Sequence, residues 1–142
     1  LPTDAEWEYA CRAGTKTPFS FGENIAPDLV NYDGSHPYIG GEKGLNRGKT
    51  VPVASLPPNP WGLHEMHGNV YEWCANYYAD YSPTPQIDPQ GPQTGTDRVL
   101  RGGSWDGDGG HVRSANRFWY GPVHRYSYLG FRLAIDQGLP AS

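Results

Sequence analysis

The sequence has little of what a nucleic-acid-binding or membrane-spanning protein requires. Its 142 residues carry a formal net charge of −4, and Lys and Arg nowhere form a run. No apolar run approaches the roughly 18 residues needed to cross a bilayer. We therefore expect no nucleic-acid partner and no membrane span in this chain.

Cysteine is also scarce, because only Cys11 and Cys74 are present. Two cysteines are too few for a disulfide framework. We expect two buried free thiols, since free cysteine packs as a small apolar residue. A single bridge between them is the alternative, and the cysteine content does not indicate a cellular compartment.

Glycine, proline and aromatic residues, in contrast, are abundant. The chain has 19 Gly and 14 Pro, nearly a quarter of all residues, and 13% of it is aromatic. Such Gly and Pro content favours loops, but disordered chains are poor in aromatic residues. The length suits one domain, so we predict a single loop-rich domain over residues 1–142 with a core of large rings.

The clearest local signal is a helix that follows Leu1-Pro2-Thr3. Thr3 is the expected N-cap, and Glu6 lies three residues later, where it completes a capping box. Trp7 and Cys11 lie one turn apart and form a short apolar stripe. Gly14 suits the end of the helix, which predicts about three turns.

Strand signals are short and separated by turns. Residues 70–74 alternate as a half-buried strand does, and residues 98–101 and 130–134 also favour strands. Residues 51–53 predict a short edge strand, because proline cannot donate into a ladder. The polar, proline-rich residues 79–97 predict a surface excursion. The pattern predicts an irregular α+β fold with short antiparallel strands and few helices.

Six motifs then occur in a characteristic order: LPTDAEWEYA, PVASLPPNPWGL, HEMHGNVYEWC, RVLRGGSW, RSANR and LGFRLA. In this order they resemble the formylglycine-generating enzyme (sulfatase-modifying factor) family. The resemblance implies an elaborated C-type-lectin-like fold. It also implies a domain without its N-terminal portion, since family members usually carry sequence before the first motif.

The family resemblance alone does not choose an activity. The family includes copper-dependent oxidases that convert a sulfatase cysteine to formylglycine, partner domains of iron enzymes, and binding proteins with no known chemistry. One subset carries C-terminal sequence that a retroelement diversifies.

The oxidases resemble one another in two cysteines shortly after the GGS motif, and soft Cu(I) prefers such thiolates. Alignment of that motif places Gly107 and Val112 near these positions, and neither can bind copper. Cys11 matches a position that is half of a structural disulfide in some members. The position of its usual partner cysteine holds Leu133 in this chain. We therefore expect no copper, assign no catalytic residue, and lean against an enzyme.

A calcium site is implied by the HEMHGNVYEW segment. Carried over by position, its ligands are the Glu65 and Glu72 side chains and the Gly68 and Val70 carbonyls. Oxygen ligands from a tight turn suit Ca2+, but family members commonly have Asn or Asp where Glu65 stands. The alternative is that Glu72 pairs with an arginine and Gly68-Asn69 is a plain turn.

Two unpatterned segments, 106–111 and 118–129, alternate with the framework motifs. They mix aromatic rings with Gly, Ser and Asp, as antibody-like paratopes do, and a rigid scaffold presents loops in this way. Ordinary loops that cover the strands are the alternative. The candidate ligand-binding residues are Asp106, Gly107, Asp108, His111, Phe118, Tyr120, His124, Tyr126 and Tyr128.

The resemblance to retroelement-diversified members supplies a second argument. Adenine substitution in AAC codons reaches Asp, Gly, His, Phe, Tyr, Ser, Val and Leu, but not Trp. The residue types at 106–111, 118, 120, 121, 123, 124 and 126–129 all obey this rule. Trp119 does not, so it is expected to belong to the packed framework.

Large rings and arginines are expected to hold the scaffold together. The predicted core rings are Trp7, Trp73, Trp105 and Phe131, each able to bury a large apolar area. Arginines clamp anionic substrates in some proteins, but here they are expected to bind backbone carbonyls and carboxylates. These arginines are Arg101, Arg113, Arg117, Arg125 and Arg132.

Together, these patterns predict a non-catalytic module that binds an unidentified protein or other ligand through loops 106–111 and 118–129. The alternative is a formylglycine-generating oxidase or a related metal-dependent oxidoreductase.

Overall fold

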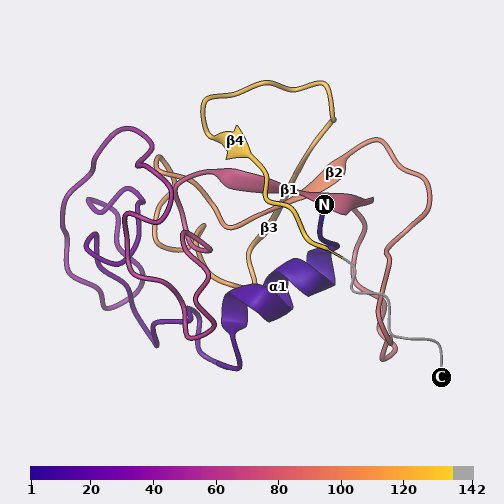
Figure 1. Cartoon of the computed structure of the whole chain (residues 1–142), viewed down its shortest axis with the longest axis horizontal. Coiled ribbons are helices and arrows are strands. Elements are labelled where there is room, and N and C mark those ends of the chain that lie inside the picture. Colours follow the sequence, from indigo (N-terminus) through magenta and orange to yellow (C-terminus); the bar gives the residue numbers. More distant parts are fainter. Residues whose placement is uncertain (136–142) are drawn as a thin grey trace.

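The computed structural model describes residues 1–135 and contains one short helix and a four-stranded sheet joined by long loops (Figure 1). The strands lie in the order β3-β2-β1-β4. β2 is antiparallel to β1 and to β3, whereas β4 runs parallel to β1. The predicted irregular α+β fold is confirmed, with a mixed rather than purely antiparallel sheet. The elements are α1 (Asp4–Arg12), β1 (Tyr71–Tyr77), β2 (Arg98–Arg101), β3 (Arg117–Tyr120) and β4 (Leu129–Gly130).

The helix α1 begins as its sequence predicts. The Thr3 hydroxyl accepts a hydrogen bond from the Glu6 amide at 3.2 Å, and the Glu6 carboxylate accepts one from the Thr3 amide at 2.8 Å. This reciprocal capping box satisfies two amides that a helix start leaves free. At the other end Ala13 adopts a left-handed conformation, φ 47°, and its amide donates to the Tyr9 carbonyl.

Two of the predicted strands are corrected. Residues 51–53 form no strand, because the Val51 amide donates to the side chain of Asn69 and Val53 is exposed. In residues 130–134 the pairing ends at Gly130. Beyond that residue, within the described part of the chain, no neighbouring strand continues the ladder. The predicted excursion over residues 79–97 is confirmed as a mostly exposed loop.

The apolar interior is divided into two clusters. Trp7 is 1% exposed at the centre of the first, as predicted. Trp73 and Trp105 are only half-buried. The prediction for Phe131 is wrong, since its ring is 66% exposed on the segment after β4. The first cluster contains Trp7, Cys11, Met66, Cys74 and Val99, and the second contains Phe19, Ile25, Val30, Tyr32 and Val112.

The buried imidazole of His67 joins the two clusters. Its ring lies 5.7 Å from that of Phe19 and its Nε2 lies 3.6 Å from the Cys11 sulfur. Nδ1 donates to the Val112 carbonyl, and Nε2 accepts from the Ser20 amide. Burial lowers the His67 pKa to about 4, in agreement with a neutral ring, because protonated Nε2 would oppose the Ser20 N–H.

A buried ion-pair network connects α1 to the sheet. The Arg101 guanidinium is fully buried and pairs with the carboxylates of Asp4 and Glu8. It also donates to the carbonyls of Ser114 and Asn116. The structural role predicted for the arginines is confirmed, since Arg113, Arg117, Arg125 and Arg132 also donate to carbonyls or carboxylates.

Candidate ligand-binding surface

The sheet has two different faces because neighbouring side chains of a strand point to opposite sides. Glu72, Val99 and Arg101 belong to the face that α1 covers, where Glu72 accepts from the indole of Trp7. The alternate residues Tyr71 and Phe118 lie on the other face, with ring centroids 5.6 Å apart. Figure 1 shows the segment between β3 and β4 extending away from α1 on this second side.

Six rings form a continuous array on that second face, which we call the aromatic ladder. From Phe118 the centroid spacing is 5.2 Å to Tyr120, and from Tyr120 it is 5.1 Å to His124. His124 stacks at 5.8 Å on Tyr126, which stacks at 5.1 Å on Tyr128. The structure thus brings together all the predicted ring residues of segment 118–129. The ladder consists of Tyr71, Phe118, Tyr120, His124, Tyr126 and Tyr128.

The ladder is anchored at its base and open at its outer rungs. The Tyr71 amide donates to the Tyr128 carbonyl at 2.8 Å, and the hydroxyls of Tyr120 and Tyr128 are 3.1 Å apart. Tyr71 is buried, whereas Tyr126 is 45% exposed and His124 is also exposed. Stacked rings of this kind offer contact area without a large entropy cost on binding.

Trp119 lies on the other side of β3 from these rungs. Its ring centroid is 4.4 Å from that of Tyr78, so it packs against β1's end as a framework residue. The packing is incomplete, because the side chain is still 43% exposed.

Segment 106–111 divides into displayed side chains and a fixed backbone. Asp106, Asp108 and His111 are exposed. The Gly107 carbonyl accepts from the Asp33 amide, and the Gly109 amide donates to the His36 carbonyl. Gly107 therefore contributes backbone rather than a displayed group. These backbone bonds hold the segment against residues 33–38.

The two predicted segments both border the start of β1: the amide of Trp105, next to segment 106–111, donates to the Asn69 carbonyl, and the Tyr71 amide donates to the Tyr128 carbonyl. The pKa of the Tyr71 phenol is raised to about 12, mainly by burial and to a smaller extent by negative charge on groups that include Asp106 and Asp108. The Tyr128 pKa is also raised, first by its hydrogen bond with Tyr120 and then by burial and nearby groups that include Asp106. The sequence could not reveal this arrangement, since no spacing rule relates either segment to the start of β1.

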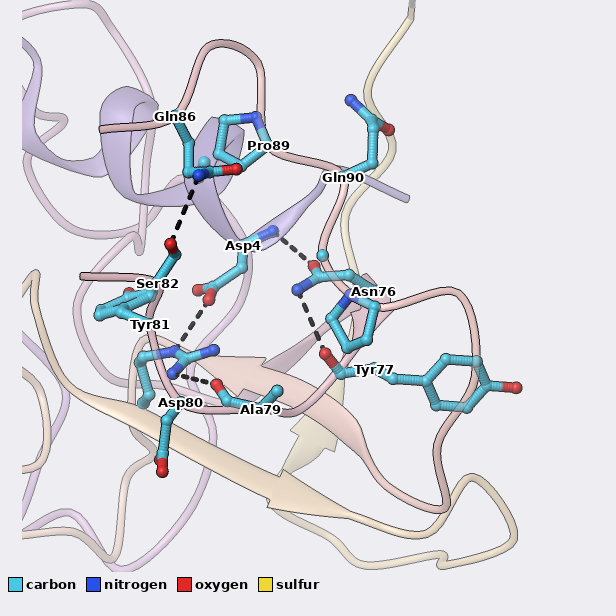
Figure 2. Close-up of a pocket in the computed structure, with 14 residues that line it drawn as sticks. Asp4, Asn76, Tyr77, Ala79, Asp80, Tyr81, Ser82, Gln86, Pro89 and Gln90 are labelled. Carbon is cyan, nitrogen blue, oxygen red and sulfur yellow. Dashed lines mark hydrogen bonds and ion pairs between the residues drawn. The ribbon is translucent and has the colours of Figure 1, made fainter. Parts of the chain in front are cut away.

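Sequence reasoning missed a pocket on the side of the sheet that faces α1. A cavity of about 620 Å³ lies between the start of α1, the end of β1 and the excursion (Figure 2). Arg117 donates there to Asp4 at 2.8 Å and to the Ala79 carbonyl at 2.9 Å. Its guanidinium also lies 4.1 Å from the Tyr81 ring centroid. The volume would suit a small ligand, but its polar groups are largely paired with one another.

The residues predicted to bind calcium have other partners in the structure. Both oxygens of Glu72 accept from Arg132, at 2.6 and 2.7 Å. Both oxygens of Glu65 accept backbone N–H groups, from Ala54 and Leu56. This arrangement does not fit a calcium cage unless Arg132 moves. Calcium binding through Glu65, Gly68, Val70 and Glu72 stays a prediction, which the melting temperature with Ca2+ and with EGTA checks.

The two cysteines are free and buried, as predicted. Burial raises the pKa of each thiol to about 12, which opposes formation of the thiolate that nucleophilic chemistry or copper binding requires. Within residues 1–135 no three His, Cys, Asp or Glu side chains are grouped to hold a metal ion. The same residues contain no helix with the length and apolar character of a membrane span.

Comparison with known proteins places the chain in a family. The sulfatase-modifying factor enzyme 1-like domain matches residues 1–137, so the chain belongs to this family, as its motifs predicted. The formylglycine-generating enzyme of Streptomyces coelicolor is 39% identical over 98% of this chain and 47% of its own length. The serine/threonine-protein kinase pkn1 of Chlamydia caviae is 40% identical over 94% of this chain and 20% of its own.

A solved structure is similar in fold as well as in sequence. Treponema denticola variable protein 1 superposes with a TM-score of 0.78 at 36% identity, over 92% of this chain and 45% of that one. The chain thus spans about half or less of the relatives that it matches. These relatives are named as an enzyme, a kinase and a variable protein. The function of this chain must therefore be argued from its own site.

Proposed function

We propose that the chain is a non-catalytic binding module that uses the sulfatase-modifying factor scaffold to display loops 106–111 and 118–129 to a protein or other ligand. The observation that carries the proposal is the aromatic ladder. Its rings stack on one another and extend out of the core, and a scaffold with buried charge pairs lies beneath them.

The two faces of the sheet differ in a way that supports this function: one holds the contacts that stabilise the fold, and the other carries the exposed rings. Contacts that fix the fold, such as Arg101 with Asp4, lie on the α1 side. We expect substitution of an outer rung, Tyr126 for example, to leave those contacts intact, because its ring contacts the other ladder rings rather than Arg101 or Asp4. The structural similarity to a variable protein agrees with a surface that is rewritten between copies, and retroelement diversification is the mechanism we propose for it.

A pair of libraries tests the proposal. One randomises ladder positions 120, 124, 126 and 128, and the control randomises exposed excursion positions 86, 87, 90 and 93. Both are selected for binding to hen lysozyme and to streptavidin. We expect binders from the ladder library only; equal yields, or none from the ladder library, would overturn the proposal. Natural variation among close strains should also concentrate at 106–111 and 118–129.

The alternative function is a formylglycine-generating oxidase, which the 39% identity to the Streptomyces coelicolor enzyme favours. The family resemblance puts Gly107 and Val112 at or near the positions of the copper oxidases' thiol pair. Cys11 and Cys74 are both buried in the cluster that also contains Trp7 of α1 and Val99 of β2. Incubation of the chain with copper and a sulfatase-motif peptide, followed by mass spectrometry, separates the two. Conversion of the peptide cysteine to formylglycine would reject the binding-module proposal.

A further inference from the structure

A hollow of about 680 Å³ lies where segment 106–111 meets residues 35–43. Two basic residues that are far apart in the sequence, Lys43 and Arg113, both line it. Asp108 of the displayed segment and the exposed Ile39 line the same hollow. The hollow is therefore a part of the displayed surface where cationic groups from two segments border one space.

The walls of the hollow are fixed to each other by backbone contacts. The Gly109 amide donates to the His36 carbonyl at 2.9 Å, and a Cβ at Gly109 would lie 2.3 Å from the Tyr38 amide nitrogen. The Tyr38 ring in turn packs at 5.3 Å against Phe19 of the second apolar cluster. None of these contacts uses a charged side chain, so the hollow keeps its shape without engaging its cations.

The cations of the hollow lack acidic partners, whereas the Asp108 carboxylate is already bound. Within residues 1–135 neither Lys43 nor Arg113 forms an ion pair. Arg113 donates through Nε to the Gly110 carbonyl at 2.9 Å, which leaves its two terminal nitrogens for another acceptor. Asp108 Oδ1 instead accepts from the Gly110 and His111 amides, at 2.8 and 3.1 Å, and lies 3.0 Å from Nδ1 of His111.

We propose that this hollow binds the carboxylate of an acidic side chain, Asp or Glu, presented by a protein partner. This inference rests on the proposed binding function and specifies the chemistry of the partner. The free end of the Arg113 guanidinium can donate two parallel hydrogen bonds to a carboxylate, and Lys43 adds a mobile point charge. Ile39, 85% exposed, offers apolar contact beside the charges. A basic side chain would instead meet like charge.

Two isosteric peptides test the inference. Acetyl-Glu-Glu-amide and its neutral analogue acetyl-Gln-Gln-amide are titrated into the whole chain, and NMR follows the backbone amides of Ile39 and Gly110. We expect saturable shifts with the acidic peptide, at least about three-fold tighter than with the neutral one, and a smaller difference at about 0.5 M NaCl. Equal affinity of the two peptides would overturn the inference, as would equally tight binding of acetyl-Lys-Lys-amide.

Two variants locate the site. Lys43→Gln removes one charge from an exposed side chain, so the acidic peptide should bind about two- to three-fold more weakly while the neutral peptide is unaffected. Arg113→Gln removes the guanidinium fork and should weaken the acidic peptide by about three- to ten-fold. The matched control Lys16→Gln changes an exposed lysine outside the hollow and should change neither.

Thermal unfolding of each variant checks that the fold is retained, because Arg113→Gln also removes the hydrogen bond to Gly110. If that variant unfolds, Lys43→Gln decides alone. An unaltered affinity for the acidic peptide in Lys43→Gln contradicts the inference.

The peptide titration decides this inference, and the ladder library decides the proposed function. Binders from the library without a preference for the acidic peptide would leave the binding function standing and remove the anion site. A preference for the acidic peptide without binders from the library would keep the hollow as an anion site and reject the ladder as a binding surface.

Discussion

The two faces of one small sheet are built on opposite principles. On the α1 face, charged groups such as Arg101 and Asp4 are buried and form ion pairs. On the other face, the rings of the aromatic ladder contact mainly their neighbours in the ladder and are increasingly exposed outward. The difference teaches that specificity of fold and freedom to vary can be separated across a single layer of strands.

The separation has a physical cause. Removal of one partner from a buried ion pair leaves an uncompensated charge, so every member constrains the others. A half-exposed ring in a stack loses only part of its contact area when it is replaced. The α1 face is therefore intolerant of change, and the outer ladder is tolerant.

The largest effect is expected from Arg101→Met, which leaves Asp4 and Glu8 without their buried partner. We expect a loss of about 3–5 kcal/mol in the free energy of unfolding, measured by urea denaturation. The control Arg125→Met lies in the ladder segment and should cost less than about 0.5 kcal/mol. Similar losses in both variants would contradict the contrast between the faces.

A pH-dependent effect is expected from His67. Its folded pKa of about 4 lies below the unfolded value of about 6.5, so the unfolded chain binds the extra proton between these values. Stability should therefore fall as the pH drops from about 6.5 to about 4, by up to about 3 kcal/mol from this group. His67→Gln should flatten this part of the profile, whereas the exposed ladder control His124→Gln should keep it.

An intermediate effect is expected at Gly109, which lies within a displayed segment but is buried. A Cβ there would lie 2.3 Å from the Tyr38 amide nitrogen, so Gly109→Ala should cost about 1–3 kcal/mol through overpacking. At neighbouring Gly110 a Cβ meets only the end of the Asp108 side chain. Gly110→Ala should change stability by less than about 0.5 kcal/mol, and thermal unfolding compares the pair. Equal costs would show that the segment is not anchored at Gly109.

The smallest effect on stability is expected from Tyr126→Ala. The ring is 45% exposed, so we expect a loss below about 1 kcal/mol. Binding of a partner selected on the wild-type ladder should weaken by about 2 kcal/mol or more, as at an interface hot spot. Tyr9→Ala, an exposed tyrosine outside the ladder, serves as the control and should leave binding unchanged. An unaltered affinity in Tyr126→Ala would remove this ring from the binding surface.

Local structure was predictable from the sequence where it depends on residues that are close together in the chain. Thr3 and Glu6 lie within one turn, so their capping box could be recognised from spacing. The strand at residues 98–101 follows from its own composition. The exposed Phe131 could not be foreseen, because apolar alternation over residues 130–134 does not reveal whether another layer covers it.

Five of the six ladder rings are among the residues that the sequence singled out, but Tyr71 is not, and the geometry of the ladder was not predictable. Ring composition identified Tyr120, Tyr126 and Tyr128. Their stacking depends on how the β3–β4 loop folds back toward β1, where the Tyr71 amide donates to the Tyr128 carbonyl, and no local pattern specifies that path. The pocket beneath residues 79–97 was missed for a similar reason. Two of its lining residues, Asp4 and Arg117, are far apart in the sequence and form their ion pair only after α1 packs on the sheet.

By itself the sequence determined the family, the capped helix and the two unpatterned segments 106–111 and 118–129, of which the second is rich in rings, because each depends on residue type and short spacing. Only the tertiary structure decided that Arg132 rather than an open position faces Glu72, and that six rings from β1, β3 and the β3–β4 loop form one ladder. Those outcomes depend on long-range packing. The free energy of such a contact depends on two segments that are distant in the sequence, so neither segment specifies the contact alone.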